Sequence, residues 1–218
     1  MTDGTESHVT SVPPPSDYRL AVPDGWERIV LDSPERWTHR IDKLVKRGLR
    51  RTQATPQLEA ALAERMRAQA EAARANGGVE MYVVNQVLGQ VAVSAGLVVT
   101  VLVPSPGTDP GDLGDIARSL ALRADADRVG DDGVTLVDLP AGPAVRHRYL
   151  RRPAPDAPGS LDGNKLAVAH LDVYLAVPHS GQRLLLSFST PTAPPLEPLV
   201  EALVTLFDSV ARTLQWMA

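Results

Sequence analysis

The sequence contains no cysteine among its 218 residues. Without a thiol the chain can form no disulfide, bind no metal through thiolates and use no cysteine nucleophile. Aromatic residues are also scarce, at 4% of the chain, which argues against a stacking platform for single-stranded nucleic acid. Lysine occurs only at positions 43, 46 and 165, so the positive charge is carried almost entirely by arginine. These absences exclude several kinds of site without indicating a function.

Targeting signals are missing from the first residues as well. Residues 1–16 are polar and then proline-rich, with neither the basic region nor the apolar region of a secretory signal. The pattern predicts a disordered tail over residues 1–16, followed by one domain over residues 17–218 in a cytoplasmic protein. The net charge of −4 gives no general attraction to nucleic acid.

The longest apolar stretch runs from Val79 to Pro104 and organises our prediction of the fold. Polar residues interrupt it too often for a lipid-spanning helix, which needs about 20 mostly apolar residues. Valine, leucine, tyrosine and threonine dominate it and favour strands. We therefore expect two adjacent strands, Glu80 to Leu88 and Ala95 to Val103.

Before this stretch the sequence predicts a hairpin and two helices. Asp24-Gly25 lies between two extended runs, 18–22 and 26–31, and is a hairpin turn signal. Capping residues and apolar periodicity then predict a two-helix insert. Its helices are expected at 34–51 and 56–76.

After the central strands, turn residues and alternating patterns predict hairpins between two further helices. The expected elements are a helix opening at Asp109-Pro110, strands at 133–139, 144–151, 166–177 and 183–190, and a closing helix at 195–216. Short turns between strands indicate antiparallel pairing. The predicted class is α+β, a mainly antiparallel sheet sandwiched by helices.

Several stretches resemble the PsbP-like family. They are YRLAVPDGW at 18–26, LPAGPAVRHRYL at 139–150, LDVYLAVPHSGQRLLLSFST at 171–190 and LFDSV at 206–210. The resemblance implies an antiparallel sheet between helices and favours non-catalytic binding. The family includes a photosystem subunit, a Ran-binding transport factor and actinobacterial proteins, and it implies no shared catalytic residues. The insert at 34–76 departs from its simplest members.

Three residues in the predicted strands could form a hydrolytic or metal site. His170 and Asp172 share one strand face, and His147 could join them if its strand is adjacent. No metal-ligand or nucleophile motif accompanies them. We expect ordinary strand histidines, with no catalytic residue, cofactor or metal. A hydrolase using these histidines is the alternative.

Two basic stretches are the candidate binding sites. The outer face of the first predicted helix carries only one acidic residue, Asp42, after Glu35, and Arg146 and Arg148 share one face of a strand. Such faces are often simply solvated, but they could also contact an acidic protein surface. The predicted partner-binding residues are Arg36, Arg40, Lys43, Arg47, Arg50, Arg146 and Arg148.

Together these patterns lead to one functional hypothesis and its rivals. We expect a non-catalytic cytoplasmic adaptor or accessory domain that binds a protein partner. The alternatives are the histidine hydrolase and a weak binder of anions or nucleic acid through the basic stretches.

Overall fold

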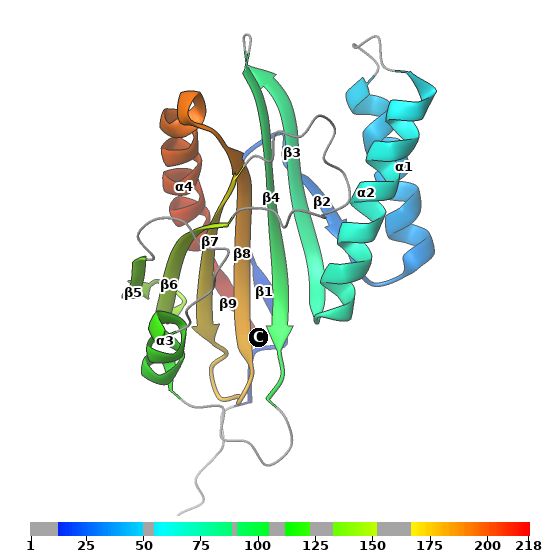
Figure 1. The fold of residues 1–218 in the computed structure, drawn as a ribbon. Coiled ribbons are helices and arrows are strands. Elements are labelled where there is room, and N and C mark those ends of the chain that lie inside the picture. The colour runs from blue at the N-terminus through cyan, green and yellow to red at the C-terminus, as the bar shows by residue number, and fades with distance from the viewer. Residues whose placement is uncertain (1–12, 50–54, 89–90, 105–111, 123–132, 152–166) are drawn as a thin grey trace, which may run out of the picture.

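The computed structural model describes residues 13–49, 55–88, 91–104, 112–122, 133–151 and 167–218. Within them a seven-stranded sheet runs antiparallel throughout (Figure 1). This confirms the α+β class. The strands follow one another across the sheet as β2 (Glu27–Val30), β3 (Gly78–Leu88), β4 (Val91–Leu102), β8 (Arg183–Thr192), β7 (Ala167–Ala176), β6 (Gly142–Arg151) and β5 (Gly133–Leu139).

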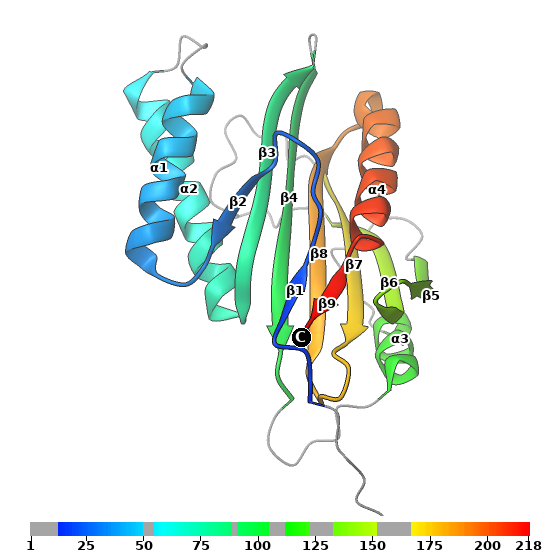
Figure 2. The ribbon, with the colours of Figure 1, turned by 180° about the vertical axis from the view of Figure 1, so that it is seen from behind.

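Helices cover both faces of this sheet. The helix α4 (Glu197–Ala211), entered through the short helix η1 (Pro194–Leu196), packs on β7 and β8. The two-helix insert, α1 (Pro34–Leu49) and α2 (Pro56–Ala75), packs on β2 and β3, while α3 (Leu113–Leu122) packs on β5 and β6. Seen from behind, α4 lies in front of the sheet (Figure 2).

Strand alternation gives the protein two apolar cores, one on each face of the sheet. Phe188 of β8 stacks on Phe207 of α4 with ring centroids 5.1 Å apart, and both rings are buried. On the other face Ile29 and Met81 pack with Trp37 of α1. Successive strand residues point to opposite faces, so the same strands supply both cores.

The prediction of a hairpin near the N-terminus is wrong. The strand β1 (Asp17–Arg19) pairs with β9 (Gln215–Met217) in a separate two-stranded ribbon, while β2 pairs with β3. The turn is present, with Gly25 at φ 87°. Seven residues separate β1 from β2, which is too long for the two-residue loops that join tight hairpins.

The closing helix is shorter than its periodicity predicts. The helix α4 ends at Ala211, and the chain then enters β9. Trp216 donates its indole N–H to the carbonyl of Ala141, 2.8 Å away, and its backbone pairs with Tyr18. These tertiary contacts outweigh the helical preference of the last residues.

The remaining expected elements agree with the structure. The two central strands, the insert helices and the later hairpins all occur near their expected positions. Among the described residues no helix combines the length and the apolar character needed to cross a membrane. Most of the expected tail and the loop 152–164 lie outside the described residues, as does the predicted helix start at Asp109-Pro110.

Candidate functional site

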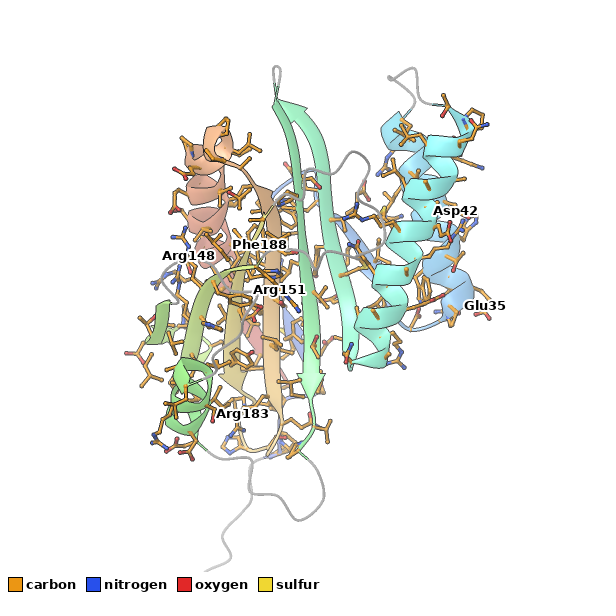
Figure 3. The ribbon with its side chains drawn as sticks, in the orientation of Figure 1. Glu35, Asp42, Arg148, Arg151, Arg183 and Phe188 are labelled. Atoms are coloured by element: carbon orange, nitrogen blue, oxygen red, sulfur yellow. The ribbon has the colours of Figure 1, made fainter. Side chains whose placement is uncertain are left out.

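The predicted basic face of α1 is present on the outside of the molecule. Trp37, Ile41 and Val45 are buried beneath the helix, so its basic residues point outward. The helix carries five basic and two acidic residues, a surplus of three positive charges on a chain of net charge −4. Figure 3 shows the two acidic residues, with Glu35 in the first turn and Asp42 beside α2. Asp42 binds Arg67 of α2.

The arginines on this face are held by carboxylates of the same chain. Arg36 binds Asp32 at 2.6 Å. Arg40 binds Glu27 of β2 at 3.0 Å, and Arg47 binds the other oxygen of the same carboxylate. Glu27 therefore ties α1 to the edge strand of the sheet. Sequence patterns could not show this, because Glu27 lies outside the helix.

The two lysines differ from these arginines. Lys43 and Lys46 are exposed on α1, and no carboxylate of the described chain lies within ion-pair distance of either. Their charge is therefore available to a partner. Arg50, the remaining predicted residue on this face, lies outside the described residues.

The two basic residues of β6 belong to a different part of the surface. Arg146 makes two parallel bonds to Asp208 of α4, at 2.9 and 3.1 Å. Arg148 binds both oxygens of Glu201, one of them at 3.1 Å, and this bond lowers the pKa of Glu201. Forked arginine–carboxylate pairs fix geometry well. The two arginines thus hold α4 on the sheet, and the structure does not bring them together with α1.

The strand residues considered for chemistry form a polar strip, which we define as His147, Tyr149, His170, Asp172 and Ser187. The register of β6 and β7 sets His147 opposite Asp172 and Tyr149 opposite His170. The Tyr149 ring stacks on both imidazoles, with ring centroids 4.6 Å from His147 and 4.8 Å from His170. The strand of His147 is therefore adjacent to the strand of His170, which was the condition for the three residues to lie together.

Asp172 lies at the centre of this strip and is buried. Its carboxylate accepts a hydrogen bond from Ser187 at 2.6 Å and one from Tyr149 at 3.2 Å. The serine hydroxyl thus donates to the carboxylate and not to an imidazole, unlike the nucleophile in a Ser-His-Asp relay. In the described part of the chain no three His, Cys, Asp or Glu residues are grouped to hold a metal ion.

Burial lowers the pKa of His170 to about 4, and the positive charge of Arg151 lowers it further. His170 is therefore a neutral imidazole at neutral pH, stacked on a tyrosine. Figure 3 shows Arg151 over the middle of the sheet. A neutral stacked ring serves packing and hydrogen bonding rather than charge attraction.

A second buried carboxylate, Glu80, lies between the sheet and the β1–β9 ribbon. Tyr18 of the ribbon donates its hydroxyl to Glu80 at 2.5 Å, Tyr82 donates at 3.1 Å, and Arg28 binds the other oxygen. Burial, followed by the neighbouring carboxylate, raises the pKa of both tyrosines, so each stays a hydroxyl donor. In the sequence, Glu80 was only an interruption in an apolar run. Its partners lie more than 50 residues away, apart from Tyr82.

Beside Glu80 the ribbon and the sheet form a groove of about 310 Å³ that is open to solvent on one side. We call it the ribbon groove. It is lined by Pro15, Ser16, Asp17, Tyr18, Arg28, Val30, Val79, Glu80, Val101, Val177, Gln182, Leu184 and Trp216. Its volume is at the lower end of the range for small-molecule sites.

Comparison with known proteins adds little to this geometry. No family model matches the chain, so membership of the PsbP-like family is not shown. No curated protein matches it. One similar solved structure is that of LpqN, involved in cell envelope biogenesis of Mycobacterium tuberculosis. It shares 10% identity with this chain over 96% of this chain and 88% of LpqN, with a TM-score of 0.44. A match this distant carries no argument about function.

Proposed function

We propose that this chain is a non-catalytic adaptor or accessory domain that binds an acidic surface of a protein partner through the outer face of α1. The observation that carries the proposal is the exposed pair Lys43 and Lys46, which have no carboxylate partner within the described residues. The cytoplasm is the location that we propose for this activity.

The surrounding geometry supports docking at this face. Its inner residues are buried, so the helix is a rigid platform rather than a loose arm. Arg40 and Arg47 share the single carboxylate of Glu27, which leaves the area around the lysines net positive. A preorganised charged face accelerates association and selects partners of opposite charge.

The polar strip gives less support to the hydrolase alternative. Its serine is bound to Asp172, and His170 is a weak base because burial lowers its pKa to about 4. General bases work best when their pKa lies near the working pH. This is why we propose binding rather than catalysis.

The test reverses the two unpaired charges. Lys43→Glu with Lys46→Glu should weaken binding to fluorescent poly-L-glutamate at least 10-fold, and should remove acidic partners captured from the native cytoplasm. Binding by the wild type should fall as salt rises, because exposed charges are screened. The melting temperature should stay within a few degrees, since neither lysine forms an ion pair with a described residue.

The matched control reverses two exposed arginines of α2 that pair with no described carboxylate, Arg65→Glu with Arg74→Glu. This pair makes the same change in total charge at another helix and should bind like the wild type. Reversal of Arg40 and Arg47 is a poorer test, because it also breaks both contacts to Glu27. Equal loss in both double variants would mean that only net charge matters, and the docking face would be rejected.

A further inference from the structure

The ribbon groove combines apolar walls with the Arg28–Glu80 ion pair and the exposed carboxylate of Asp17. Valines from β2, β3 and β4, together with Pro15, Val177, Leu184 and Trp216, make up seven of its thirteen lining residues. At one end Arg28 binds the buried Glu80. Ligand sites commonly have this composition, an apolar body with a few converging polar groups.

Arg28 retains binding capacity towards the groove. Its contact with Glu80 uses Nε, and its side chain is 61% exposed. A guanidinium has five N–H donors. Within the described residues its partners are the Glu80 carboxylate and the Tyr82 hydroxyl, which take up only part of this capacity. The Nη groups can therefore donate to an oxygen atom of a ligand in the groove.

The charges around the groove decide which ligand fits. Glu80 already offsets Arg28, so an added anion would meet the carboxylates of Glu80 and Asp17 with no free cation to balance it. An added cation would meet Arg28 between the apolar walls, and the remaining carboxylate, Asp17, is exposed to water, which screens its charge. Burying an uncompensated charge is costly. A ligand without net charge avoids both conflicts.

We propose that the ribbon groove binds a small neutral amphipathic molecule. Its aliphatic or aryl body lies against the valine and tryptophan walls, and its hydroxyl or carbonyl oxygen accepts a hydrogen bond from Arg28. The groove has the volume of about ten water molecules of liquid, so the ligand is small. This site is distinct from the basic face of α1 and does not depend on partner binding there.

The test compares three probes with the same six-carbon chain: 1-hexanol, hexylammonium and hexanoate. The reporter is the indole N–H of Trp216, which lines the groove and is fixed by its bond to Ala141. Its signal is followed in a nitrogen–proton correlation spectrum of the full chain. Addition of 1-hexanol should shift the Trp216 signal, and the shift should saturate with a dissociation constant in the millimolar range. Both charged probes should bind at least 10-fold more weakly.

Two variants locate the binding. Val30→Trp, at a partly exposed position in the lining, should fill the groove and abolish the hexanol shift. Leu136→Trp, at an exposed position on β5 at the far edge of the sheet, is the matched control and should leave it intact. Arg28→Lys keeps the positive charge beside Glu80 but removes the planar guanidinium with its several N–H donors. This change should weaken the binding of hexanol about 3-fold or more.

Three results would overturn the proposal. Absence of a saturable hexanol shift would show that the groove is not a site. Equal or tighter binding of a charged probe would reject selection for neutral ligands. Persistence of the shift in folded Val30→Trp protein, judged by its thermal melt, would place the binding elsewhere.

Discussion

Two buried carboxylates, Glu80 and Asp172, lie on opposite faces of the sheet, and tyrosine hydroxyls donate to both. A buried charge needs such partners, because desolvation is otherwise uncompensated. Strand alternation alone placed Arg146 and Arg148 on one face of β6 and His147 and Tyr149 on the other, and the structure confirms this.

The partners of Glu80 could not be predicted in this way. Tyr18 is 62 residues away and Arg28 is 52 residues away. Local periodicity indicates which face a side chain occupies, but not which distant strand will lie beside it. The sequence patterns therefore did not predict the ribbon groove.

Replacement of His170 should change how stability depends on pH. Its pKa is lowered from 6.5 to about 4 in the folded protein, so between these values the unfolded chain binds a proton that the folded chain does not. Stability is then fully present above pH 6.5 and is lost as pH falls towards 4, by roughly 3 kcal/mol. In His170→Gln the free energy of unfolding, measured with urea at several pH values between 4 and 6.5, should depend less on pH than in the wild type.

His39→Gln, which removes an exposed imidazole from α1, is the matched control. If the free energy of unfolding of His170→Gln falls with pH as steeply as that of the wild type, groups other than the His170 imidazole cause the acid sensitivity.

At the scale of elements, α4 is fixed to the sheet by two kinds of contact. Its buried side packs on β7 and β8, and Arg146 and Arg148 reach its acidic residues from β6. This helix was predicted from the sequence. Its end was not, since the pairing of β9 with β1 determines where the helix stops.

The change Phe207→Ala should test whether α4 is part of the core. The ring is 2% exposed and stacks on Phe188. Loss of a buried ring leaves a cavity and should lower the free energy of unfolding by about 3–5 kcal/mol. Chemical denaturation followed by circular dichroism measures this quantity. Leu206 is the preceding residue and is only partly buried, so Leu206→Ala should lower the free energy of unfolding clearly less. Equal losses in the two variants would mean that the Phe207 ring is not specifically packed.

For the whole molecule, the sheet separates two cores that use the same strands. Met81 contributes to the α1–α2 side and its neighbour Tyr82 to the α4 side. The sequence predicted helices on the sheet because each helix has an apolar stripe and each strand alternates. It could not place β1 beside β9, because strands distant in the chain leave no local signal of their pairing.

Shared strands should make the protein unfold as one unit. Ile41 is fully buried between α1 and the sheet. The change Ile41→Ala should lower the free energy of unfolding by about 2–5 kcal/mol. Tryptophan fluorescence and far-ultraviolet circular dichroism should then report one coincident transition, as in the wild type. Separate transitions for the two probes would show that α1 and α2 unfold independently of the rest.

The pairing of β1 with β9 also has a consequence for biosynthesis. Asp17 lies opposite Met217, and a ribosome adding 5–20 residues per second needs about 10–40 s to make the chain between them. During this time Tyr18 can find Glu80 but not the strand that completes its ribbon. The floor of the ribbon groove can thus form on the nascent chain, while Trp216 closes its wall only after nearly all of the domain has been translated.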